Sequence, residues 1–356
     1  MKRRILESGI TKVRRILGIS LMMILMLTAL TGCSQNPSDD EVKEEEEEDT
    51  LDIGLSIDSL VIERWQRERD LFVSKATELG AEVNVQNANG EVEEQIKQIQ
   101  YFIDKKVDVI VIISIDDEAL NDVIAKAKKA GIRVIAYDRL IRNANVDVYM
   151  SVDNERVGEL MATYIKKAIG NSGTIIQIKG SPTDYNVQMV QNGFERIIST
   201  TDIHIVYSEY SDNWMAENGY RVTSNYLASG RVPDAIMCGN DNIASQSIRA
   251  LNENRLGGQV CVVGQDADLE ACQRIVEGTQ YMTVFKPVEM LAKSAAEMAV
   301  AMAKGEDLGI KDTINDGTYD VPYEKLDPIA VTAENMDEVI TGKYHQESEI
   351  YINVRD

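Results

Sequence analysis

The stretch Gly131-Ile132-Arg133-Val134-Ile135-Ala136-Tyr137-Asp138-Arg139 is an apolar, largely β-branched run that ends in an acid beside a base. Such a run is typical of a strand that is buried on both faces of a parallel sheet. Ligands of open α/β sheets bind beyond the carboxyl ends of the strands, so Asp138 and Arg139 stand where a polar small molecule would be held. Taken alone, the pair would be better explained as a surface ion pair that closes a loop. The same pattern recurs along the chain, which favours a ligand site.

From residue 51 onward, short β-branched runs alternate with longer amphipathic runs, which predicts parallel sheets with helices on both faces. In the first half we expect strands at 51–57, 81–86, 107–113, 132–136 and 148–152, and helices at 63–79, 92–104 and 119–129. After Asp153 we expect strands at 173–178, 203–207, 235–238, 260–263 and 281–285, and helices at 155–169, 186–199, 215–228, 243–254, 269–276 and 288–303. The fold class is therefore α/β, with two doubly wound lobes of ~150 residues each.

The first 32 residues have the composition of an export signal: basic residues, an apolar stretch at 16–30, and then Leu30-Thr31-Gly32-Cys33. The apolar stretch is short for a membrane-spanning helix. The segment resembles a bacterial lipoprotein signal, which implies a lipid on Cys33 and a chain anchored on the outer face of the cytoplasmic membrane. An ordinary signal peptide or an uncleaved anchor is the alternative.

Residues 33–50 include the acidic run Glu44 to Asp49 and almost no apolar side chains, which predicts a disordered tether. Such a tether would hold a folded domain clear of the membrane. The whole chain has 59 acidic and 37 basic side chains and a formal net charge of −22. We therefore do not expect it to bind nucleic acid.

Polar or charged residues follow most of the predicted strands, and Trp214 adds an aromatic face at a turn. They include Arg64, Trp65, Asp138, Arg139, Asp153, Asn154, Asn240, Asp241, Asp266 and Lys286. Carboxylate, guanidinium, amide and indole groups around one cleft suit a sugar, whose hydroxyls donate and accept hydrogen bonds and whose C–H faces pack on rings. Some members have a structural alternative. The acids and amides at 153, 154, 240 and 241 could be helix N-caps, and Trp65 could be a core residue.

Signals for an enzyme are missing from the sequence. There is no glycine-rich phosphate loop and no nucleophile elbow, and the two histidines are His204 and His345, the second in the polar C-terminal tail. Cys238, Cys261 and Cys272 have no metal-type spacing, and a disulfide between the first two stays open. We expect no catalytic residue, no metal and no cofactor.

The stretch 51–351 resembles the type I periplasmic binding proteins, the sugar receptors of ABC importers. The resemblance is carried by Asp58-Ser59-Leu60-Val61-Ile62-Glu63-Arg64-Trp65, Val85-Gln86-Asn87-Ala88-Asn89-Gly90, Ala136-Tyr137-Asp138-Arg139, Ser151-Val152-Asp153-Asn154-Glu155-Arg156-Val157-Gly158, Gly264-Gln265-Asp266-Ala267-Asp268 and Met282-Thr283-Val284-Phe285-Lys286-Pro287. Within that family, the Glu-Arg-Trp and Gln-Asp-Ala-Asp segments separate xylose receptors from ribose and galactose receptors. The resemblance therefore implies D-xylose or a related monosaccharide as the ligand.

The resemblance also implies a set of sugar-contacting residues, with Trp65 and Asp153 as near neighbours. The set is Arg64, Asp138, Arg139, Asn154, Trp214, Asn240, Asp266 and Lys286. Two lobes joined by a three-segment hinge would close over the sugar, with crossovers near Ser151, Val284 and Asp320. Residues 51–151 and 285–320 would form the N-terminal lobe, and residues 152–284 and 321–356 the C-terminal lobe.

The partner implied by the resemblance is an ABC permease in the membrane, to which the receptor delivers its sugar. The alternative is a sensor that docks on a membrane histidine kinase. A sugar-active enzyme of the same fold class is a third possibility, which the missing catalytic groups disfavour.

Overall fold

The computed structural model describes residues 50–354. The expected export signal, the lipidation site Cys33 and the tether up to residue 49 lie outside the described residues. Within residues 50–354, no helix is both long enough and apolar enough to span a bilayer.

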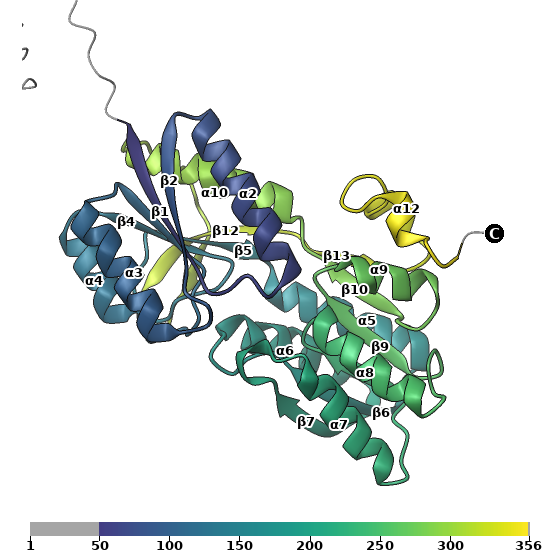
Figure 1. Ribbon diagram of the computed structural model, residues 1–356. Coiled ribbons are helices and arrows are strands. Elements are labelled where there is room, and N and C mark those ends of the chain that lie inside the picture. Colours follow the sequence, from purple (N-terminus) through teal and green to yellow (C-terminus); the bar gives the residue numbers. More distant parts are fainter. Residues whose placement is uncertain (1–49, 355–356) are drawn as a thin grey trace, which may run out of the picture. The chain divides into compact units, whose positions relative to one another are not determined.

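Two sheets of mostly parallel strands form two lobes, which confirms the predicted α/β fold class (Figure 1). The first sheet has the strand order β11-β12-β5-β4-β3-β1-β2 and the second β13-β10-β9-β8-β6-β7. The first is built from β1 (Leu51–Ile57), β2 (Ala81–Asn87), β3 (Val109–Ile112), β4 (Arg133–Tyr137), β5 (Val148–Val152), β11 (Thr313–Asn315) and β12 (Asp320–Leu326). The second is built from β6 (Ser172–Lys179), β7 (Asp202–Tyr210), β8 (Ala235–Cys238), β9 (Cys261–Gln265), β10 (Met282–Phe285) and β13 (Ile329–Val331).

Helices cover both faces of the first sheet. Helices α2 (Glu63–Glu78) and α10 (Val288–Ala303) pack on one face, and α3 (Val92–Lys105) and α4 (Asn121–Lys129) on the other. Strand β3 shows why its sequence is apolar throughout. Val109 and Val111 enter the first core, whereas Ile110 and Ile112 enter the second, because successive side chains of a strand point to opposite faces.

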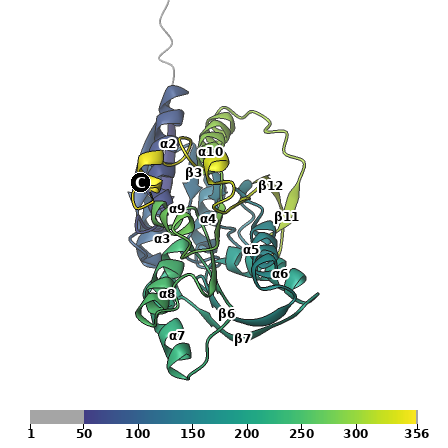
Figure 2. The same ribbon diagram turned by 90° about the vertical axis from the view of Figure 1, so that its right-hand side faces the viewer.

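The second sheet is also covered on both faces (Figure 2). Helices α5 (Asn154–Ile169) and α6 (Tyr185–Ile198) pack on one face, and α7 (Glu217–Ala228) and α8 (Asp241–Glu253) on the other. Gly158 and Gly193 allow α5 and α6 to approach closely, because a Cβ at Gly158 would lie 1.9 Å from the Val190 carbonyl oxygen. The shorter elements are η1 (Asp212–Trp214), α9 (Leu269–Val276), α11 (Met336–Val339) and α12 (Glu347–Ile350).

Two helices pack on one lobe although the strand that precedes each of them belongs to the other lobe. Strand β5 belongs to the first sheet, but α5 packs on the second. Strand β10 belongs to the second sheet, but α10 packs on the first. The third crossover differs from the expected position near Asp320. Strand β12 pairs with β5 as far as Leu326, so the chain leaves the first sheet only after that residue.

Candidate functional site

Asp138 and Asp266 occupy equivalent positions in the two lobes. Asp138 follows β4 and Asp266 follows β9, and both have a positive φ, 63° and 102° respectively. Each backbone N–H donates to a carbonyl of the neighbouring strand, Met150 at 2.7 Å and Val284 at 2.9 Å. Positive φ is uncommon for residues other than glycine and persists where the surroundings enforce it. The chain therefore turns in the same way at two strand ends that face one site.

Arg64, at the start of α2, connects the two aspartates. Its Nη2 lies 2.7 Å from Asp138 Oδ2, its Nη1 lies 3.6 Å from Asp266 Oδ1, and its Nε lies 2.5 Å from Glu68 Oε1. The arginine is only 2% exposed. Burial favours the protonated form of Asp138, but Arg64, Lys286 and Arg139 outweigh burial and hold the pKa of Asp138 below its ordinary value. Asp138 is therefore a carboxylate, which can accept hydrogen bonds from a ligand as well as from Arg64.

Arg139 forms a second buried network that also spans the lobes. Its Nη1 lies 2.8 Å from Asp58 Oδ2 and its Nε 2.9 Å from Asp184 Oδ2, which belongs to the second lobe. It also donates to the Ser114 carbonyl at 2.7 Å. Burial raises the pKa of both Asp58 and Asp184 above the ordinary value, and the nearby Arg139 cation only partly offsets this.

Lys286 and the two amides complete the polar lining. Lys286 Nζ lies 2.9 Å from Asp266 Oδ1. Asn240 accepts from the Ile243 N–H at 3.0 Å as the N-cap of α8, and it also lines the pocket. The cap and the ligand-binding interpretations of Asn240 are thus compatible. Asn154 donates to Ser151 Oγ at 3.2 Å and also lines the pocket.

The two tryptophans line the same pocket but pack against different groups. Trp65 is buried, and the Arg64 guanidinium carbon lies 4.3 Å from its ring centroid. Trp214, in η1, packs over the backbone of Gly180, where an added Cβ would lie 2.2 Å from the ring. The indole Nε1 of each has no hydrogen-bond partner, and Gln265 Oε1 in the same pocket also has none. Buried polar atoms of this kind are costly unless a ligand or water satisfies them.

The structure brings together all of the predicted site residues except Asp153. The pocket is lined by Ile62, Arg64, Trp65, Asp138, Arg139, Asn154, Lys179, Gly180, Asp184, Asn186, Val187, Val190, Gln191, Trp214, Met237, Gly239, Asn240, Gln265, Asp266 and Lys286. Asp153 is not among them. It is the N-cap of α5, accepting from the Arg156 N–H at 3.0 Å, and its carboxylate pairs with Lys325 at 3.0 Å.

Several lining residues were missed from the sequence, above all Lys179, Asp184, Asn186 and Gln191. Lys179 is the last residue of β6, so the rule that ligands bind at strand ends could have found it. Asn186 donates to the Asp138 carbonyl at 2.8 Å across the lobes, a contact that no local pattern indicates.

Other site types find no support within residues 50–354. No group of three or more His, Cys, Asp or Glu side chains there is arranged to hold a metal ion. Cys238, Cys261 and Cys272 are free thiols, so the disulfide left open above is not formed.

Comparison with known proteins places the chain among solute receptors. A family model described as a periplasmic binding protein domain matches residues 53–307. The D-xylose-binding periplasmic protein of Haemophilus influenzae is 45% identical over 307 residues, covering 85% of this chain and 92% of the relative. The D-xylose-binding periplasmic protein of Escherichia coli is 42% identical over 304 residues, covering 84% and 92%. An ABC transporter solute-binding protein of Clostridium phytofermentans, solved with β-D-glucose, is 27% identical with a TM-score of 0.77, covering 84% of this chain and 99% of that one.

Proposed function

The chain belongs to the periplasmic binding protein family and is a sugar-binding receptor of the ABC-transporter type, and from this premise we propose that its ligand is D-xylose. The observation that supports the proposal best is the bridge formed by Arg64 between Asp138 and Asp266. One aspartate comes from each lobe, so a sugar held between them would contact both lobes at once.

We assign sugar contacts to the residues that were predicted and that line the pocket. They are Arg64, Trp65, Asp138, Arg139, Asn154, Trp214, Asn240, Asp266 and Lys286. The ring hydroxyls would pair with the carboxylates and the cations, each of which presents more than one hydrogen-bonding site. The unpaired indole N–H groups and the amide oxygen of Gln265 would gain partners, and the C–H faces of the sugar would pack on the indole rings.

Binding would be coupled to movement of the lobes about the three crossovers after β5, β10 and β12. A ligand that contacts both lobes binds the closed arrangement more tightly than the open one, and this difference shifts the equilibrium toward closure. The partner of the closed form would be an ABC permease. On this proposal the protein has no catalytic activity.

The receptor is exported in the manner of its family, and we propose that a lipid on Cys33 anchors it to the membrane. The support is the sequence Leu30-Thr31-Gly32-Cys33 after an apolar stretch. Labelling cells with a radioactive fatty acid should mark the wild type and not a Cys33→Ala variant. Equal labelling of both would refute the anchor.

Isothermal titration calorimetry against a panel of pentoses and hexoses tests the ligand. D-xylose should bind most tightly, and L-arabinose, D-ribose and D-galactose more weakly. Tighter binding of a different sugar would overturn the assignment of D-xylose, while the receptor class would stand.

A further inference from the structure

The C-terminal segment, residues 332–351, packs on the second lobe beside α9 (Figure 1). Its apolar side chains Met336, Ile340, Tyr344 and Ile350 share a core with Cys272 and Ile275 of α9. Gln273 of α9 also donates to the Glu349 carbonyl at 2.9 Å. The sequence placed His345 in a polar tail, but this residue is buried and its segment packs in the core of the second lobe.

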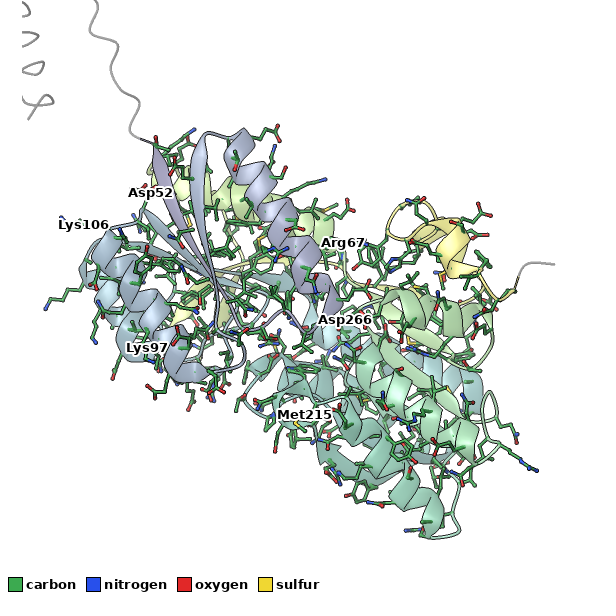
Figure 3. The ribbon with its side chains drawn as sticks, in the orientation of Figure 1. Asp52, Arg67, Lys97, Lys106, Met215 and Asp266 are labelled. Atoms are coloured by element: carbon green, nitrogen blue, oxygen red, sulfur yellow. The ribbon has the colours of Figure 1, made fainter. Side chains whose placement is uncertain are left out.

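Tyr344 connects this segment to α2 of the first lobe. Arg67 Nη1 donates to the Tyr344 carbonyl at 2.6 Å, and the Arg67 guanidinium carbon lies 4.0 Å from the Tyr344 ring centroid. Arg67 is three residues after Arg64 on α2, and residues at this spacing are neighbours along a helix. The C-terminal segment therefore holds the helix that carries Arg64 (Figure 3).

His345, the next residue, contacts the turn that carries Asp266. It is 5% exposed, and its Nε2 lies 2.8 Å from the carbonyl oxygen of Ala267. Burial lowers the pKa of His345, so the ring is neutral at pH 7 and its Nε2–H donates to that oxygen. Asp266 and Ala267 both have a positive φ, 102° and 54°, and a turn of this kind depends on bonds from its surroundings.

We propose that Tyr344 and His345 are positioning residues for sugar binding. Tyr344 holds the helix that carries Arg64, and His345 holds the turn that carries Asp266. Together they fix the positions of the two partners of the ion pair that crosses the cleft. The C-terminal segment thereby belongs to the binding machinery, although none of its residues lines the pocket. This proposal rests on the proposed sugar-binding function.

The first test is a double-mutant cycle on D-xylose affinity, measured by calorimetry. His345→Ala should weaken binding at least tenfold, and His345→Gln, whose amide can donate to the same carbonyl, should recover most of the loss. If His345 acts through Asp266, the double variant His345→Ala/Asp266→Asn should bind D-xylose less than threefold more weakly than the single variant Asp266→Asn. Wild-type affinity in His345→Ala, or fully additive losses, would overturn the proposal.

Arg67→Met tests the other contact, with Arg69→Met as the matched control on the same helix. Arg69 lies two residues after Arg67 and pairs with its own neighbour, Asp70. Arg67→Met should raise the dissociation rate of D-xylose at least fivefold, and Arg69→Met should leave it within twofold. Equal effects of the two variants would contradict the role of Tyr344.

Hydrogen exchange of the ligand-free protein separates this proposal from the choice of sugar. The amides of residues 266–268 should exchange faster in His345→Ala than in the wild type, and at the wild-type rate in His345→Gln. This result requires no sugar, so it would stand if D-xylose were the wrong ligand. Unchanged exchange in both variants would overturn the positioning role.

Discussion

Replacing Arg139 with methionine should destabilise the protein in a pH-dependent way. Arg139 is paired at 2.8 and 2.9 Å with Asp58 and Asp184, whose side chains are 9% and 3% exposed. Removing the guanidinium leaves two buried carboxylates without their positively charged partner. Breaking a buried ion pair costs about 3–5 kcal/mol of unfolding free energy. The variant should therefore lose about 4 kcal/mol of unfolding free energy at pH 7.

Protonation of the two carboxyls limits that loss. Protonating a carboxyl of ordinary pKa 3.8 costs at most about 4.4 kcal/mol at pH 7 and about 1.6 kcal/mol at pH 5. Burial already raises the pKa of both aspartates, and loss of Arg139 raises it further. A carboxyl with a raised folded pKa contributes a loss of stability that grows as the pH rises above its unfolded pKa, so the variant's loss of unfolding free energy should be smaller at pH 5 than at pH 7.

Urea unfolding of the purified protein at pH 5 and pH 7 measures the effect. Arg133→Met is the matched control, because Arg133 is an arginine on β4, the strand just before Arg139, but its side chain is 59% exposed, and the substitution should cost under about 1 kcal/mol. Adding Asp58→Asn and Asp184→Asn to Arg139→Met should restore most of the stability. A loss below 1 kcal/mol at pH 7, or one equal at both pH values, would refute this reasoning.

Three further predictions concern the pocket and its edge. Asp266→Asn keeps the shape of the side chain and removes its charge, so calorimetry should show at least tenfold weaker D-xylose binding; unchanged affinity would contradict the site assignment. Gly180→Ala places a methyl group 2.2 Å from the Trp214 ring, so the ring must move and the affinity should fall at least tenfold, whereas the wild-type value would show that the ring does not contact the sugar. Asp153→Ala removes the N-cap of α5 and should cost about 1 kcal/mol in urea unfolding while changing the affinity less than twofold; a larger loss of affinity would restore it to the site.

Much of the fold could be predicted because buried parallel strands and amphipathic helices have distinct local patterns. The ends of the elements were less predictable. Val107 was expected to start β3, but its N–H bonds to Phe102 at the end of α3, so β3 begins at Val109. The third crossover was misplaced for a different reason. Strand β12 pairs with β5, far away in the sequence, and its own residues do not indicate which sheet it joins.

The site was predictable to the extent that it follows strand ends. Asp138 and Asp266 were proposed as site residues in this way, and both line the same pocket. Asp153 fits the same rule, but a carboxylate at a helix start can turn back to cap the helix, and here it does. His345 was placed in a polar tail because its burial depends on Ala267, 78 residues earlier in the chain. Contacts of this range leave no local pattern.

The exchange of helices between the lobes has a consequence for the order in which the molecule can assemble. The first sheet is incomplete until β12 has been made, and one of its faces is covered only in part, by α2, until α10 has been made. A nascent chain that ends before Val288 therefore exposes the apolar surface that Leu291, Ala295 and Ala299 later cover. The lobe whose synthesis begins first cannot finish folding until the other is nearly complete, and pairing over such distances is slow. The same connections that let two lobes act as one receptor therefore delay completion of the first lobe until most of the chain has been made.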